Sequence, residues 1–138
     1  MGGVTGMLAR MLTTGGRTRE AEELVHELAE LVKRETGPES RGTVAGQIGG
    51  YGSWLLQQNS RKDAAGILRL AITVDPDNAN LRNNLAWALA SFPDSPAYEP
   101  AEALDVARKA VALSPKSAFL WNTLGVAAYR TGDWKTAS

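Results

Sequence analysis

Residues 80–90 read NLRNNLAWALA and residues 119–129 read FLWNTLGVAAY, and these two segments share one pattern. In each, an aliphatic residue is followed directly by a small one, and another apolar residue comes three positions later. A second apolar run follows each segment and opens on alanine, at Ala103 and at Ala137. A repeat of this kind decides the fold class, because repeat periods of about 20 to 50 residues indicate solenoids or arrays.

The pattern also occurs twice upstream. Residues 48–55 read IGGYGSWL, and the distance from Ala64 to Pro76 equals that from Ala103 to Pro115. A weaker copy begins at Leu8. In the copy that begins at Leu8, the second apolar run contains Ala21, Val25 and Leu28. In the 48–55 copy, the second run contains Ala64, Leu68 and Ala71 and is followed by Pro76.

These copies resemble tetratricopeptide (TPR) repeats, whose pattern is W-x2-L-G-x2-Y, then A-x3-F, then a proline, with a period of about 34 residues. The resemblance covers almost the whole chain. It implies an all-α fold, a right-handed α-solenoid of antiparallel helix pairs with about seven helices, in one domain over residues 1–138. The repeats fall at about 2–44, 45–78, 79–117 and 118–138, the last being incomplete. The first two periods are longer than the family norm.

Apolar spacing and turn residues place the individual helices and loops. We expect Thr18 to be an N-cap and Asp75-Pro76-Asp77-Asn78 to be the turn between two repeats. Helices are expected at about 4–12, 18–34, 44–58, 61–74, 79–91, 100–113 and 118–130, with long loops at Thr36–Gly42 and Phe92–Pro100. The second loop either binds a ligand or only bridges two helices. A further helix is expected to open at Asp133, which suggests a fragment of a longer protein or a surface covered by another subunit.

Small residues are expected where the helices of a repeat cross, because only a small side chain lets two backbones approach. These positions are Gly52, Ala86 and Gly125 on the first helices, and Ala64, Ala71, Ala103, Ala110 and Ala137 on the second helices. Leucines are expected to fill the remaining space, namely Leu55, Leu68, Leu85, Leu89, Leu113 and Leu124.

Composition excludes several function classes. Lysine plus arginine (15) balance aspartate plus glutamate (15), so no basic field favours nucleic acid. The chain has no cysteine, which excludes disulfides and thiolate sites, and its apolar runs are too short for a membrane span. The N-terminus lacks the features of a signal peptide. We therefore expect a soluble, cytoplasmic protein without a cofactor.

Candidate chemistry is sparse. His26 is the only histidine, so no second histidine or cysteine can complete a metal or catalytic site. The run Gly46–Gly52 lacks the Gly-Lys-Ser/Thr ending and the preceding strand of a phosphate loop. We expect no catalytic residues and no metal site, and therefore no enzyme.

The resemblance implies a concave groove that is lined by the first helices and binds extended or helical peptides. Asparagine amides are suited to a peptide backbone because they carry two donors and an acceptor. Trp87 is open to two interpretations: it contacts the ligand, or it packs under the Phe92–Pro100 loop. By equivalent spacing the groove residues are Asn80, Asn83, Asn84, Trp87, Phe119, Asn122, Thr123, Val126 and Arg130.

One subfamily of these repeats grips C-terminal carboxylates with lysines, arginines and asparagines. Asn84 fits an asparagine place of that clamp, but its basic places fall on Gly49, Phe119 and Thr123. The expected ligand is therefore less acidic than the C-terminal carboxylates that this subfamily binds. The leading hypothesis is a non-catalytic protein–protein interaction scaffold that binds a peptide or a partner domain in its groove. The alternative is a self-association or interdomain packing module, acting through the uncapped C-terminal end with Trp121, Tyr129 and Trp134.

Overall fold

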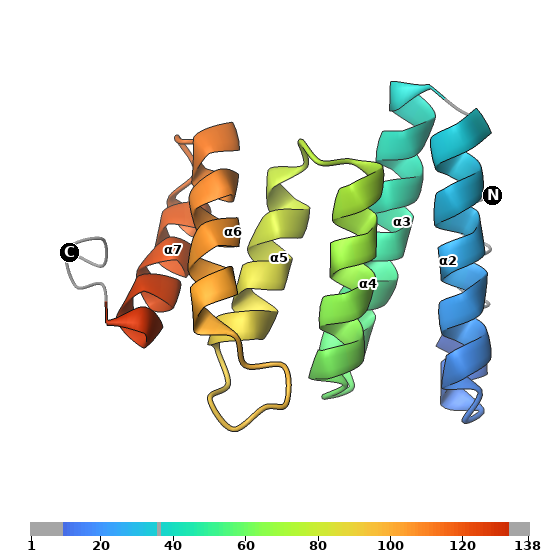
Figure 1. The fold of residues 1–138 in the computed structure, drawn as a ribbon, viewed down its shortest axis with the longest axis horizontal. Helices are drawn as coiled ribbons and strands as arrows, with labels where there is room; N and C mark the ends of the chain where they lie inside the picture. The colour runs from blue at the N-terminus through green and yellow to red at the C-terminus, as the bar shows by residue number, and fades with distance from the viewer. Residues whose placement is uncertain (1–9, 36, 133–138) are drawn as a thin grey trace. The chain divides into compact units, whose positions relative to one another are not determined.

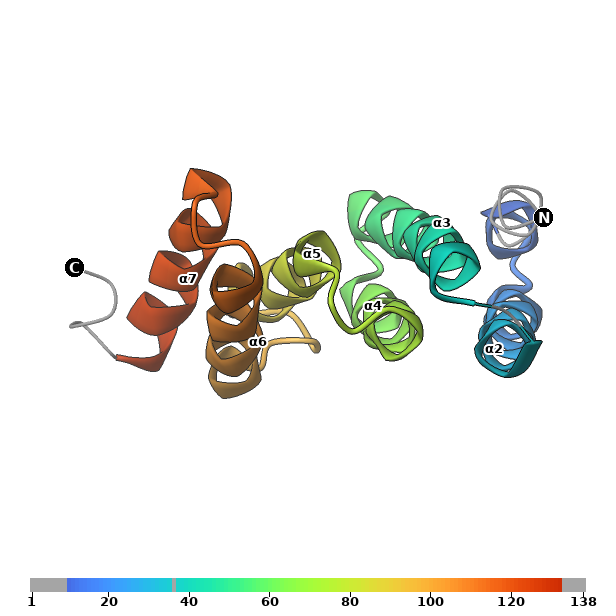
Figure 2. The same ribbon diagram turned by 90° about the horizontal axis from the view of Figure 1, so that it is seen from above.

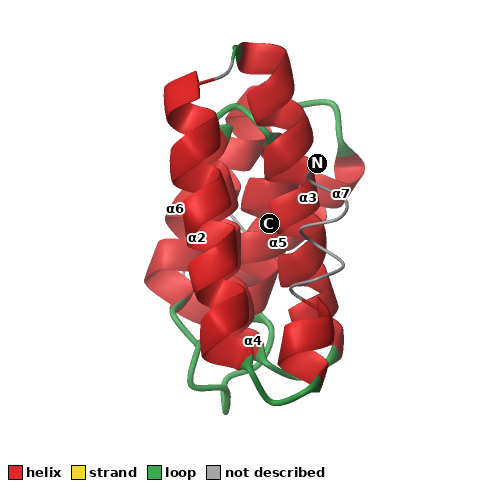
Figure 3. Ribbon diagram, turned by 90° about the vertical axis from the view of Figure 1, so that its right-hand side faces the viewer, coloured by secondary structure: helices red, strands yellow, loops and turns green. Residues whose placement is uncertain are grey.

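The structure is a computed structural model that describes residues 10–35 and 37–132, and all regular structure there is helical (Figures 1 and 3). The all-α prediction is therefore confirmed. The helices are α2 (Thr18–Glu35), α3 (Pro38–Gln57), α4 (Arg61–Val74), α5 (Ala79–Ala90), α6 (Pro100–Leu113) and α7 (Ala118–Thr131), preceded by a helical stretch at residues 10–14. The rest of the helix expected at 4–12 and the helix expected from Asp133 lie outside the described residues. None of the described helices combines the length and apolar character needed to cross a membrane.

The chain divides into two compact units, Met1–Pro76 and Asp77–Ser138. The boundary falls in the turn that the sequence predicts, where proline disfavours helix for the residue before it. Asn78, the second residue of this unit, is the N-cap of α5, because its side-chain oxygen accepts a hydrogen bond from the Leu81 amide at 3.1 Å. This bond satisfies one of the amides left without a partner at a helix start.

In the Met1–Pro76 unit, α2, α3 and α4 pack against one another and successive helices run antiparallel (Figure 1). Gly52 lies where α3 meets α4. A Cβ atom at Gly52 would be 3.0 Å from Leu68 Cγ and 3.4 Å from Ile67 Cγ2. Carbon atoms prefer a separation of about 3.5–4.0 Å, so this contact leaves no room for a side chain. The close approach predicted at Gly52 is confirmed.

The loop predicted at Thr36–Gly42 is wrong for most of its length, because α3 already begins at Pro38. Proline suits the first position of a helix, where its missing N–H has no partner in any case. Gly37 takes the N-cap position with an extended backbone. The N-cap predicted at Thr18 is also shifted, since Thr18 is the first residue of α2.

In the Asp77–Ser138 unit, α6 packs against α5 and α7, and α5 packs against α7 (Figure 2). Among the described residues, the predicted small and leucine positions of this unit form its core, with the exceptions of Gly125 and Leu113, and Ala137 lies outside the described residues. Leu113 is 42% exposed because α6 ends at this residue. The buried positions are Leu85, Ala86, Leu89, Ala103, Ala110 and Leu124.

The Phe92–Pro100 loop joins α5 to α6 and has internal hydrogen bonds. The Ser95 hydroxyl accepts a bond from the Ala97 amide at 3.1 Å, and Ala97 is 5% exposed. The Glu99 amide donates to the Leu89 carbonyl at 2.8 Å, near the end of α5. The loop is thus attached to the helix that it follows.

Candidate functional site

The predicted groove residues on α5 are divided between surface and core. Asn80 is exposed, Trp87 is 42% exposed, and Asn84 is half-buried. Asn83 is only 3% exposed, so its amide has almost no surface with which to contact a ligand. Trp87 is therefore a surface residue, and Asn83 belongs to the interior.

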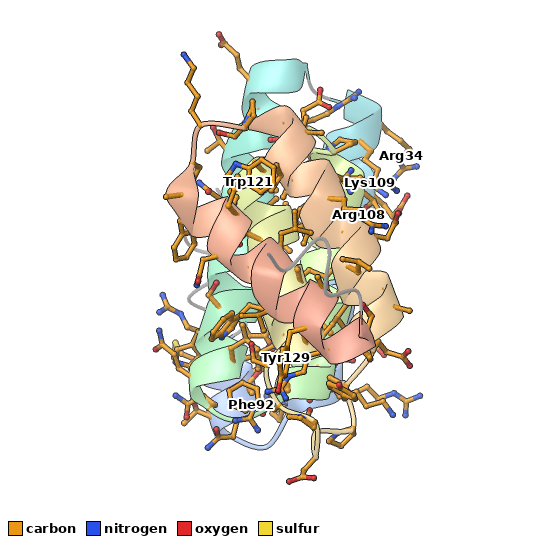
Figure 4. The ribbon with its side chains drawn as sticks, turned by 90° about the vertical axis from the view of Figure 1, so that its left-hand side faces the viewer. Arg34, Phe92, Arg108, Lys109, Trp121 and Tyr129 are labelled. Carbon is orange, nitrogen blue, oxygen red and sulfur yellow. The ribbon has the colours of Figure 1, made fainter. Side chains whose placement is uncertain are left out.

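The α7 helix presents three aromatic side chains to solvent. Phe119 is 65% exposed, Trp121 is 50% exposed and Tyr129 is 55% exposed. Figure 4 shows Trp121 and Tyr129 along α7. Large exposed apolar side chains that adjoin one another mark interaction surfaces more often than isolated ones do.

A shallow groove of about 500 Å³ runs along this side of α7. Its lining residues recur at steps of one, three and four positions, which places them on one face of a helix. They are Trp121, Asn122, Gly125, Val126, Tyr129 and Arg130. We call this set the α7 face. The α7 face combines residues from two surfaces that were predicted separately. Asn122, Val126 and Arg130 come from the predicted groove, and Trp121 and Tyr129 come from the predicted C-terminal end. The third residue predicted for that end, Trp134, lies outside the described residues.

Trp121 is held in place although half of its surface is exposed. Its indole N–H donates to the Pro115 carbonyl at 2.7 Å, in the turn between α6 and α7. A side chain that is already fixed loses less conformational entropy when a partner binds, so this geometry suits an aromatic anchor.

Arg130 has a structural bond that its predicted role in ligand binding does not include. Its Nε–H donates to the carbonyl of Ala90, the last residue of α5, at 3.2 Å. A positive charge at a helix C-terminus is favourable, because the terminal carbonyls lack partners within the helix and carry partial negative charge. The Arg130 guanidinium also lies 5.9 Å from the centre of the Tyr129 ring. Arg130 thus ties α7 to α5 at the edge of the groove.

Thr123 is likewise turned inward. It is 3% exposed, and its hydroxyl donates to the Phe119 carbonyl one turn earlier at 3.4 Å. Of the nine predicted groove residues, those with an exposed or half-exposed side chain are Asn80, Asn84, Trp87, Phe119, Asn122, Val126 and Arg130.

Gly125 lies in the middle of the α7 face, four residues from both Trp121 and Tyr129. A Cβ atom at Gly125 would meet no atom within 4 Å. The helix predicted to cross α7 at this glycine, expected from Asp133, lies outside the described residues. The two aromatic side chains instead flank an open notch.

The Met1–Pro76 unit has a second open hollow of about 600 Å³, lined by Arg10, Met11, Thr14, Gly15 and Trp54. The Trp54 ring stacks on the Tyr51 ring, with 6.1 Å between ring centres. Met11 is 64% exposed. This hollow is mainly apolar and offers few polar groups to orient a ligand.

Within residues 10–35 and 37–132, no three histidine, cysteine or acidic side chains are grouped so as to hold a metal ion. His26 is an exposed residue of α2. No protein-family model matches the chain, and a search of curated proteins finds no match either.

Proposed function

We propose that the protein is a non-catalytic protein–protein interaction scaffold, a TPR-like α-solenoid that binds a peptide or a partner domain through α5 and α7. The α7 face carries this proposal, because it combines a groove with two half-exposed aromatic side chains, Trp121 and Tyr129. Aromatic residues dominate the binding energy of many interfaces, since they bury a large area at a small entropy cost.

The ligand contacts are the exposed residues of the two helices. Asn80 and Trp87 lie on α5, Phe119 and Asn122 lie on α7, and α5 packs against α7 within one unit. The Asn122 amide can donate to and accept from a peptide backbone beside the Trp121 ring. These positions include no acidic or basic side chain. We therefore expect a ligand recognised by apolar side chains and backbone groups rather than by its charge.

Self-association is the second candidate, and the notch at Gly125 favours it. At Gly52, which has the same place in the repeat pattern, the branched side chains of Ile67 and Leu68 fill the corresponding space. A helix of a second copy could cross α7 at Gly125 in the same way. In both candidates the α7 face binds another protein chain. The balanced charge of the chain fits a cytoplasmic protein partner better than nucleic acid or a membrane.

Sedimentation velocity over a concentration series distinguishes the two candidates. Gly125→Arg blocks the notch without an internal clash, because the position is open. Gly66→Arg is the matched control, since Gly66 is an equally open glycine in the middle of α4. A mass that rises with concentration and falls to that of the monomer only in the Gly125 variant supports self-association.

If the chain stays monomeric, a peptide library is screened against it. The scaffold proposal then requires selected peptides that lose affinity in Trp87→Ala, Asn122→Ala or Gly125→Arg and keep it in Gly66→Arg. Peptides that bind all four variants equally, or a screen and a concentration series that both show nothing, would reject the proposal.

A further inference from the structure

The α7 helix is divided lengthwise into a buried half and the α7 face. The buried half packs against α5 and α6, and the α7 face lies on the other side with Trp121 and Tyr129 near its two ends (Figure 4). The buried residues are Leu120, Thr123, Leu124, Ala127 and Ala128. A second helix that lies along α7 suits such a face, because the side chains of one helix fit between those of the other.

The positions of the α7 face are symmetric about a point midway between Gly125 and Val126. Counted outward from that point, position 125 corresponds to 126, position 122 to 129, and position 121 to 130. Two antiparallel copies of α7 with a two-fold axis through this point would place each position against its counterpart. Every contact then occurs twice, as in any interface built around a two-fold axis.

The contact at the centre of this arrangement fills the notch at Gly125. A Cβ atom added at Gly125 would meet nothing within 4 Å, and the branched side chain of Val126 of the second copy lies directly opposite. The same kind of packing occurs inside the Met1–Pro76 unit, where Ile67 and Leu68 fill the space beside Gly52. An open glycine and a branched aliphatic side chain are thus complementary halves of one contact.

The two outer contacts are also chemically favourable. The Asn122 amide meets Tyr129 of the second copy, whose hydroxyl oxygen can accept a hydrogen bond from it. Arg130 meets the half-exposed Trp121 ring, and a guanidinium beside a tryptophan ring is a favourable cation–π contact. The Nε–H of Arg130 already donates to the Ala90 carbonyl, which restricts the side chain before the partner arrives.

The charge of the α7 face also suits a second copy of itself. Among the described residues that line the groove, Arg130 is the only charged one. In the antiparallel arrangement the two Arg130 side chains start about 13 Å apart along the helix axes, which is beyond the Debye length of about 8 Å at physiological salt. Two copies of the face therefore meet without strong repulsion.

We propose that two copies of the chain dimerise through the α7 face, with the two α7 helices antiparallel around a two-fold axis between Gly125 and Val126. This proposal rests on the proposed function of the face as a surface for protein, and it gives the self-association candidate a defined geometry. Trp121 and Tyr129 are 50% and 55% exposed, so together they contribute roughly 200 Å² of the about 800 Å² that each partner of a stable complex buries. The dimer should therefore be weak and dissociate below roughly 10 μM.

Cysteine cross-linking tests this geometry directly, because the chain has no cysteine of its own. In the proposed dimer the two copies of residue 126 are offset by less than about 2 Å along the helix axes, and the two copies of residue 118 by about 22 Å. Under mild oxidation, Val126→Cys should form a disulfide-linked dimer at least about tenfold faster than Gly66→Cys, an exposed position on α4 that measures random collision. Ala118→Cys, at the exposed first residue of α7, should be no faster than Gly66→Cys.

Two further variants keep the result decisive. Gly125→Arg in the Val126→Cys chain should lower the rate to that of Gly66→Cys. If circular dichroism shows that Val126→Cys has lost helix, a mixture of Asn122→Cys and Tyr129→Cys chains replaces it, since the axis brings these two positions together.

Rapid cross-linking of Ala118→Cys would indicate parallel helices, and cross-linking at residue 126 no faster than at residue 66 would indicate no contact there. Either result overturns the proposal. Sedimentation of the unaltered chain then separates the two proposals. A dimer without these cross-links associates through another surface, whereas a monomer leaves the peptide candidate to its own screen.

Discussion

Gly52 offers the sharpest test of how α3 and α4 pack. In Gly52→Ala, the gain in helix propensity is about 1 kcal/mol. The new Cβ atom would lie 3.0 Å from Leu68 Cγ, and Leu68 and Ile67 are 0% and 2% exposed, so neither side chain has room to move. Overpacking of this kind costs about 1–3 kcal/mol. The net change should range from no effect to a destabilisation of about 2 kcal/mol.

The same helix supplies matched controls. Gly46 and Gly50 are exposed residues of α3, and a Cβ atom at either would meet nothing within 4 Å. Gly46→Ala and Gly50→Ala should therefore show the propensity gain alone, about 1 kcal/mol each. The free energies of unfolding of Gly50→Ala and Gly52→Ala should differ by about 1–3 kcal/mol, although the two positions are only two residues apart.

Urea denaturation followed by circular dichroism measures these differences, and amide exchange of α3 and α4 assigns them to the Met1–Pro76 unit. Leu68→Ala provides a second check. It should cost about 2–5 kcal/mol in the unaltered chain and less in Gly52→Ala, where the new methyl group occupies part of the cavity. If Gly52→Ala is as stabilising as Gly50→Ala, the spacing of α3 and α4 does not depend on this glycine, and the steric argument fails.

Three smaller predictions concern single residues. Asn78→Ala removes the N-cap of α5 and should lower the free energy of unfolding by about 1 kcal/mol, whereas Asn80→Ala, an exposed change on the same helix, should not lower it. Arg130→Met keeps most of the aliphatic stem but removes the donor to the Ala90 carbonyl, and urea midpoints should show a loss of about 1 kcal/mol; an unchanged midpoint would mean that the bond adds no stability. Burial raises the pKa of Tyr51 above 10.0, so the unfolded chain ionises first and stability should fall as pH rises past that value; an alkaline absorbance titration that shows no tyrosine titrating above its ordinary range would contradict this.

The sequence predicts the first and last residues of a helix correctly where strong local signals mark both ends. Both α4 and α6 have the predicted limits, and Pro100 marks the start of α6. The beginning of α3 was missed because Gly37 and Pro38 are typical of loops, yet the same residues also suit the first turn of a helix. Local composition could not decide between these structures, because the packing of α3 on α4 supplies the missing stability.

The candidate site was harder to predict, because spacing gives the rows of a helix but not the direction in which each row faces. Neighbouring residues on a helix point about 100° apart, so a small error in rotation exchanges surface for core. Asn83 and Thr123 were assigned to a surface row for this reason and are buried. The bond from Arg130 to Ala90 joins residues that are 40 positions apart, and no local pattern indicates such a partner.

Gly52 and Gly125 show where the repeat pattern informs and where it stops. Both glycines have the same place in the pattern, and each permits a second helix to approach. At Gly52 the side chains of α4 fill the space, whereas at Gly125 the described residues leave it open. A glycine in this pattern therefore indicates that close approach is possible, and its surroundings decide whether the approach occurs. Trp121 and Tyr129 flank this open position on the α7 face. The pattern predicts a helix contact there, and residues 10–35 and 37–132 do not supply it. For that reason Gly125→Arg, which changes that contact and no other, is the most informative variant for the proposed function.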